Sequence, residues 1–222
     1  MNSNDPELDG ILKQALKARY VKQFDGYQEA PAGVVRQVAA IWLVLETRGI
    51  RYSNIAGASG VSNKPEPGKI YYQRVRTVDQ SLHSAQANCV DGTVLFASAL
   101  EHIGIDCELV HPNGHMFLLF YAGKGRKVPI CLETTMLGAH APVNPHLPNP
   151  IAHFFPWYDF RDRPFEAAVQ YGDYELVNDA KTAAGIKNKT ASLWELSLIS
   201  IAKARTAGIL PLPAPSDTDN GK

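Results

Sequence analysis

An apolar segment that begins at a cysteine constrains the fold of this chain most. Asn88 and Cys89 precede residues that are apolar around most of a helical circumference as far as Ile103, which predicts a helix buried on nearly all sides. Asn88 is a favoured N-cap residue and Gly104 a favoured helix stop. Cys89 is therefore predicted to be the first helical residue, where the positive end of the helix dipole favours thiolate over thiol. This position makes Cys89 a candidate nucleophile.

The cysteines also allow a plainer interpretation, because free cysteine usually packs as a small buried hydrophobe. Cys107 and Cys131 fit it, since each lies in an apolar, strand-like run without a capping residue before it. Three cysteines without dense spacing do not indicate a disulfide framework. We therefore expect a cytoplasmic protein if this is the full-length chain, and an exported one if it is a fragment lacking its signal peptide.

Length and charge narrow the class of protein. With 222 residues, the chain is long enough for one well-buried domain. We predict a single domain over residues 1–210 and a disordered, polar tail over 211–222. Basic and acidic residues number 22 each, and without a basic cluster this balance argues against a nucleic-acid partner. No apolar run is long enough to span a bilayer, and the first residues lack the pattern of a signal peptide.

Hydrophobic spacing predicts an α+β fold in which the Cys89 helix packs on an antiparallel sheet, with extra N- and C-terminal helices. The pattern changes from helical to alternating after Gly104. The predicted helices cover residues 6–20, 31–49, 77–87 behind a capping box, 89–103, 165–171, and 192–206 behind a second capping box. The predicted strands cover residues 106–111, 115–121 and 128–133.

His115 and Glu133 are the candidate partners of Cys89. If residues 122–126 form the hairpin loop, the two lie directly opposite each other, with Cβ atoms about 4.5–5.5 Å apart. A slip of one residue would place them on opposite faces, and Pro129 requires an edge strand or a position without a ladder hydrogen bond. A thiol, a base and a group that orients the base are what nucleophilic cysteine catalysis needs. The alternative is a histidine–carboxylate pair that only stabilises the hairpin.

Other chemistries find less support, and we predict neither a metal nor a cofactor. Cys107, His111 and His115 are spaced by four, but their surroundings predict strand and turn rather than one helix face. There is no C-x-x-C and no H-E-x-x-H. The glycine-rich stretches at 57–60 and 123–125 lack the context of a phosphate-binding loop or a G-x-S-x-G elbow.

The order of these residues resembles the transglutaminase-like superfamily, whose members share the papain-like cysteine-peptidase fold. The resemblance is carried by residues 88–92, 96–105, 114–117 and 132–135. Residues 48–53, 73–76 and 204–211 also resemble an uncharacterised bacterial branch of that superfamily. Two features depart from its usual pattern: the acid is glutamate rather than aspartate, and Met116-Phe117 stands where many members have Ala-Trp.

The resemblance implies that Cys89 is the nucleophile, His115 the general base and Glu133 the acid. It implies a cysteine-dependent acyl transfer, most simply hydrolysis of a peptide or amide bond in a peptide or protein substrate. An oxyanion site is expected at the backbone N–H of Cys89, with Gln73 and Asn88 as candidate oxyanion or substrate-binding side chains. The alternatives are an inactive binding module on the same fold, and a structural domain that docks through the final helix around Trp194 and Leu198. The sequence indicates no oligomeric state.

Overall fold

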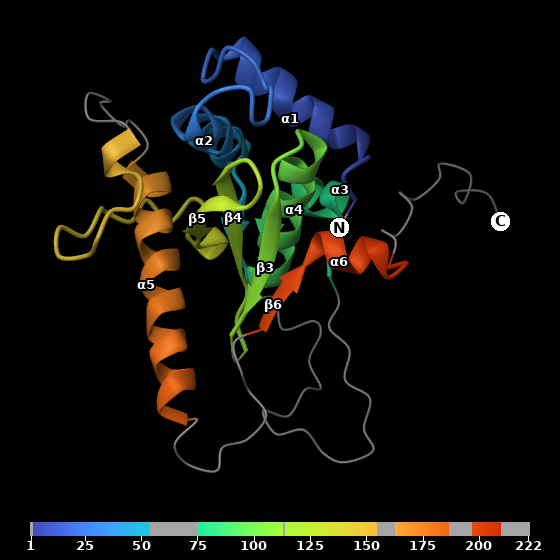
Figure 1. The fold of residues 1–222 in the computed structure, drawn as a ribbon. Coiled ribbons are helices and arrows are strands. Elements are labelled where there is room, and N and C mark those ends of the chain that lie inside the picture. The colour runs from blue at the N-terminus through green and yellow to red at the C-terminus, as the bar shows by residue number, and fades with distance from the viewer. Residues whose placement is uncertain (1, 54–74, 113, 155–162, 187–196, 210–222) are drawn as a thin grey trace.

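The computed structural model describes residues 2–53, 75–112, 114–154, 163–186 and 197–209 (Figure 1). Within them the fold is α+β with an antiparallel sheet. The helices are α1 (Pro6–Lys17), α2 (Pro31–Thr47), α3 (Val78–Ser84), α4 (Cys89–His102), α5 (Arg163–Ile186) and α6 (Ile201–Thr206), with 3-10 turns η2 (Thr134–Met136) and η3 (Ala152–Phe154). The strands are β1 (Arg51–Tyr52), β2 (Gln86–Ala87), β3 (Cys107–His111), β4 (Phe117–Gly123), β5 (Lys127–Leu132) and β6 (Ser197–Ser200).

The main sheet has the order β5-β4-β3-β6, and β1 and β2 form a separate parallel pair. Figure 1 shows α4 against the middle of the sheet and α5 alongside the edge strand β5. Trp42 of α2 joins these layers, because its ring lies 5.8 Å from that of Phe96 on α4 and 5.9 Å from that of Phe165 on α5. All three side chains are fully buried. The core therefore fixes α4 and α5 relative to each other.

The start of α4 confirms the predicted cap. The backbone N–H of Asp91 donates to Asn88 Oδ1 at 2.9 Å, and Asp91 Oδ2 accepts from the backbone N–H of Asn88 at 3.2 Å. This reciprocal pair is a capping box, and Cys89 is the first helical residue. Gly104 follows the helix with a φ of +74°, a conformation that glycine adopts without strain. The local signals in the sequence therefore place both ends of this helix.

The predicted hairpin register was wrong by two residues. Gly123 pairs with Lys127 and Tyr121 with Pro129, because the strands continue to a loop of only 124–126. Two residues of that turn adopt positive φ, Gly125 at 73° and Arg126 at 61°, which closes the shorter loop. A two-residue shift keeps every side chain on its predicted face. His115 and Glu133 therefore remain neighbours on one face, but diagonally rather than directly opposite. Among the described residues β5 is the end strand of the sheet, which is one of the two positions expected for Pro129.

Helix α5 is much longer than the predicted helix over residues 165–171. It continues through Gly172 to Ile186. Gly172 does not end the helix but lies where α5 packs closely against a neighbouring segment. A Cβ at Gly172 would lie 3.0 Å from the backbone nitrogens of Leu132 and Glu133. The backbone N–H of Glu133 also donates to the carbonyl of Ala168 at 3.0 Å. Gly172 therefore lets α5 approach the end of β5.

Replacing Gly172 with alanine is expected to destabilise the fold by about 1–3 kcal/mol, the usual cost of overpacking. The added methyl would meet rigid backbone, and this clash outweighs the roughly 1 kcal/mol that alanine gains over glycine in a helix. Chemical denaturation checks the prediction. Gly10→Ala in α1 is the matched control, because its Cβ would meet only the flexible end of Arg48, and it should be neutral or stabilising. Equal effects of the two changes would contradict this account.

The predicted final helix over residues 192–206 is wrong in its middle part. Residues 197–200 form strand β6, which pairs antiparallel with β3 from Glu108↔Ser200 to His111↔Ser197. Ser200 then caps the short helix α6, accepting from the backbone N–H of Lys203. Leu198 therefore lies in a strand rather than on a helix face, and Trp194 lies outside the described residues, as does the tail over 211–222. The edge of β3 explains the difference, because its unpaired backbone N–H and C=O groups form a strand pair with residues 197–200.

Candidate active site

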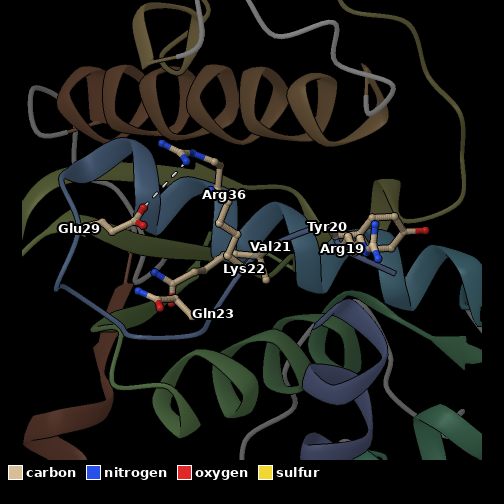
Figure 2. A pocket seen from close by; sticks show the side chains of 8 residues that line it. Arg19, Tyr20, Val21, Lys22, Gln23, Glu29 and Arg36 are labelled. Carbon is tan, nitrogen blue, oxygen red and sulfur yellow. Dashed lines mark ion pairs between the residues drawn. The ribbon is translucent and has the colours of Figure 1, made fainter. Parts of the chain in front are cut away.

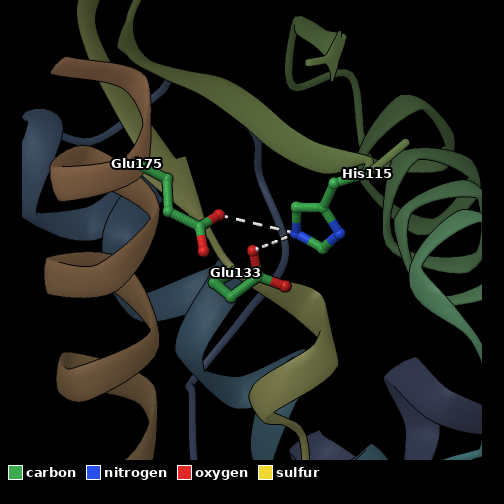
Figure 3. A group of neighbouring side chains, drawn as sticks. All are labelled: His115, Glu133 and Glu175. Atoms are coloured by element: carbon green, nitrogen blue, oxygen red, sulfur yellow. Dashed lines mark hydrogen bonds and ion pairs between the residues drawn. The ribbon is translucent and has the colours of Figure 1, made fainter. Parts of the chain in front are cut away.

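Three segments that are distant in the sequence bring the predicted catalytic residues together. Cys89 opens α4, His115 lies in the turn before β4, and Glu133 follows β5 as the N-cap of η2. His115 was predicted as a strand residue, but β4 begins only at Phe117. Figure 3 shows the imidazole of His115 pointing toward Glu133, with a second carboxylate, Glu175 of α5, beside it.

The pairing of His115 and Glu133 has the geometry of a strong hydrogen bond. His115 Nε2 lies 2.7 Å from Glu133 Oε2, a length typical of a charge-assisted bond. The Glu133 side chain is only 4% exposed, and its other oxygen, Oε1, accepts from the backbone N–H of Thr135 at 2.9 Å and from the Thr135 hydroxyl. Both oxygens of the carboxylate are therefore occupied, and its orientation is fixed.

This bond determines which ring nitrogen is left for chemistry. An ionised carboxylate only accepts hydrogen bonds, so Nε2 carries a proton toward Glu133. Figure 3 shows the other ring nitrogen, Nδ1, on the side of the ring away from both carboxylates. Interaction with the Cys89 side chain is the largest cause that raises the pKa of His115, followed by Glu133 and Glu175. The pKa of the imidazole therefore depends on both the thiol and the acid.

Exposure separates Cys89 from the two other cysteines. All three are free, but Cys89 is partly exposed whereas Cys107 and Cys131 are buried. Burial raises the pKa of the Cys107 and Cys131 thiols far above its ordinary value, so neither is a nucleophile in the folded protein. The interpretation of these two as core residues agrees with their 4% and 1% exposure.

Glu175 is the site residue that the sequence analysis missed. Its Oε2 lies 3.5 Å from His115 Nε2, and its side chain is 37% exposed. Burial and the neighbouring Glu133 raise the pKa of Glu175, against the lowering effect of His115. Burial alone would also raise the pKa of Glu133, but the interactions with His115 and Glu175 outweigh this and leave the pKa lowered.

A signal for Glu175 exists in the sequence. The apolar and small residues of this segment recur at helical spacing through the glycine and beyond it, at Phe165, Ala168, Val169, Gly172 and Leu176. Reading that pattern through Gly172 extends the helix past Glu175. Its meeting with His115 depends on how α5 crosses β5, which the spacing does not show.

The hydroxyl of Thr93 ties the three segments of the site together. Thr93 is fully buried on α4, and its Oγ1 donates to the carbonyl of Cys89 at 2.7 Å. The same atom lies 3.2 Å from the carbonyl of Met116 and 3.1 Å from the Thr134 hydroxyl. Met116 and Thr134 are the direct neighbours of His115 and Glu133. One buried polar atom therefore contacts Cys89 itself and the direct neighbours of His115 and Glu133.

The structure describes one of the two candidate oxyanion side chains. Gln73 lies outside the described residues. Asn88 is described, and its side-chain oxygen accepts the cap hydrogen bond from Asp91. Asp91 is buried and engaged with the backbone N–H and guanidinium of Arg76 at 2.8 and 2.6 Å. Asn88 and Asp91 thus hold the start of the helix, and the backbone N–H of Cys89 remains a candidate oxyanion donor.

A separate hollow of about 240 Å³ lies away from these residues. Figure 2 shows it between the end of α1 and the start of α2, where Arg36 reaches toward Glu29 at 4.0 Å. It is lined by Arg19, Tyr20, Val21, Lys22, Gln23, Glu29, Arg36 and Gln37. None of the four site residues borders it, so converging side chains rather than this hollow mark the candidate site.

Comparison of the chain with protein-family models, with curated proteins and with solved structures found no match. No helix among the described residues is long and apolar enough to cross a bilayer.

Proposed function

We propose that this protein is a cysteine-dependent acyl-transfer enzyme with a papain-like, transglutaminase-like core, and that it hydrolyses a peptide or amide bond. The observation that carries the proposal is the His115 imidazole, which bonds Glu133 at 2.7 Å and whose pKa is raised most strongly by Cys89. A partly exposed cysteine at a helix N-terminus, a histidine and a carboxylate in this order have the roles of nucleophile, base and orienter.

The reaction begins with transfer of the Cys89 proton to Nδ1 of His115. The thiolate attacks the carbonyl carbon, and the resulting oxyanion is stabilised by backbone N–H groups at the start of α4, which have no partner within the helix. The carbon–nitrogen bond then breaks as Nδ1 returns the proton to the leaving amine, which leaves a thioester on Cys89. Water, deprotonated by His115, attacks the thioester and releases a carboxylic acid and the free thiol. Throughout, Glu133 holds Nε2–H and stabilises the imidazolium.

Hydrolysis is preferred over transfer to an amine because the sequence shows no signal for an acceptor-lysine site. The substrate is proposed to be a peptide or a protein. The remaining alternative is a binding module that keeps the three side chains without using them, and the reactivity of the Cys89 thiol separates the two.

The test is labelling by a peptidyl acyloxymethyl ketone, which mimics the acyl group and forms a stable bond with a nucleophilic thiol. Wild type should be labelled at Cys89, as located by mass spectrometry, and Cys89→Ala should remain unlabelled. His115→Ala keeps the thiol but should react about 10²–10⁴ times more slowly, the usual contribution of a general base. Equal labelling of wild type and Cys89→Ala would exclude the nucleophile. Labelling at Cys89 that does not depend on His115 would favour the binding module.

A further inference from the structure

Two carboxylates converge on one ring nitrogen of His115, which is more than a catalytic triad requires. His115 Nε2 and one oxygen each of Glu133 and Glu175 lie within 4.8 Å of one another. The single N–H on Nε2 is directed at Glu133 at 2.7 Å, whereas Glu175 Oε2 stands 3.5 Å away. Glu175 Oε2 is buried and has no hydrogen-bond partner among the described residues. A buried carboxylate oxygen without a donor is costly unless a cation compensates it.

The three atoms form a donor set suited to a divalent transition-metal ion. One imidazole nitrogen and two carboxylate oxygens are ligands that zinc accepts, and three protein ligands leave a fourth position for water. Zinc–nitrogen and zinc–oxygen distances of about 2.0–2.2 Å imply ligand atoms roughly 3.2–3.6 Å apart in a tetrahedral site. The 3.5 Å separation of His115 and Glu175 fits this spacing, and the closer pair with Glu133 needs to open by less than about 1 Å.

The surroundings of the three ligands also suit a metal. Glu133 Oε1 is held by Thr135, and Oε2, which faces His115 Nε2, would exchange that hydrogen bond for the ion. Such outer hydrogen bonds are what orient ligating carboxylates. The ligands come from the turn before β4, the end of β5 and helix α5, which fixes their spacing through the fold. A divalent ion would also offset both carboxylate charges, whereas an imidazolium offsets only one.

We propose that His115, Glu133 and Glu175 bind a divalent metal ion of the zinc class, and that this ion switches off Cys89. The metal takes the Nε2 lone pair, so the one remaining ring proton sits on Nδ1 toward the thiol. His115 then has no free nitrogen to accept the Cys89 proton, and Glu133 no longer braces the ring. The metal-binding half of the proposal stands without catalysis; the inhibitory half rests on the proposed function.

Metal binding is tested first in the full-length Cys89→Ala variant, because removing the thiol excludes it as a ligand. Isothermal titration with zinc chloride should show one site, and cobalt(II) should give a visible ligand-field spectrum. Adding Glu175→Gln should weaken zinc binding by at least about tenfold and abolish the cobalt spectrum. Asp173→Asn is the matched control, because this acid is also partly buried on α5 and lies outside the cluster. Equal zinc affinity in the two variants, or no binding below millimolar zinc, would overturn the site.

Inhibition is tested in the chain with its thiol intact. Zinc should slow labelling of Cys89, and a chelator should restore it. In Glu175→Gln the same zinc concentration should have little effect, provided that the melting curve shows a folded protein. Zinc that binds without slowing the labelling would overturn the inhibitory half alone. A wild type that cannot be labelled even without zinc would overturn the proposed function and leave the metal site supported by the titrations.

Discussion

The Glu133→Gln variant is expected to keep its fold and to lose most of the reactivity of Cys89. Glu133 Oε1 accepts two hydrogen bonds from Thr135, so the carbonyl oxygen of glutamine will keep that position. The amide NH₂ then faces His115 Nε2, which must become an acceptor. The ring proton moves to Nδ1, toward Cys89, and His115 can no longer take the proton of the thiol. The labelling rate should fall by a factor on the order of 10²–10⁴.

The second-order rate constant for labelling by the peptidyl probe at neutral pH measures this effect, with circular dichroism to verify the fold. Glu166→Gln is the matched control: this acid lies on α5 and bonds Asn149 rather than His115. It should react at the wild-type rate. A Glu133→Gln protein that is folded and equally reactive would show that the carboxylate is structural only, and the role of His115 as a braced base would have to be abandoned.

Replacing Asp91 with alanine is expected to have the largest effect on stability, a loss of roughly 3 kcal/mol, at the lower end of the cost of breaking a buried ion pair. The Asp91 side chain is fully buried, whereas Arg76 is 20% exposed and can partly regain water. The change also removes the acceptor for the backbone N–H groups of Asn88 and Arg76. Because these bonds hold the first turn of α4, Cys89 should lose reactivity as well.

Urea denaturation provides the measurement, as a lower midpoint at an unchanged slope. Asp79→Ala is the control, because Asp79 also lies in the first turn of a helix, α3, but is 42% exposed and pairs with the exposed His83. A surface pair of this kind contributes less than about 1 kcal/mol. Similar midpoints for the two variants would mean that the buried pair does not stabilise the start of α4.

The parts of the site that could be predicted from sequence depend on local signals. The N-cap Asn88 and the stop Gly104 lie within a turn of the helix that they bound, so the position of Cys89 follows from neighbouring residues. The contact of His115 with Glu133 followed from the alternation of side chains along the hairpin. That alternation determines the face but not the loop length, so the register was wrong by two residues and the face was right.

The parts that could not be predicted depend on contacts between distant segments. The helix predicted over residues 165–171 ended just before Gly172, and the role of this glycine is visible only where α5 crosses the backbone of β5. Leu198 fits a helical pattern until the free edge of β3 pairs with its backbone. Glu175 combines both problems, since it lies beyond the glycine and meets His115 only across the fold.

The shared hydroxyl of Thr93 has a consequence for motion. Since it joins the carbonyls beside Cys89 and His115 to the hydroxyl beside Glu133, none of the three segments can open without disturbing the other two. In hydrogen exchange, amides at the start of α4, the beginning of β4 and η2 should therefore exchange with one common opening free energy, as a single cooperative unit. Thr93→Val should split that unit into separately fraying pieces.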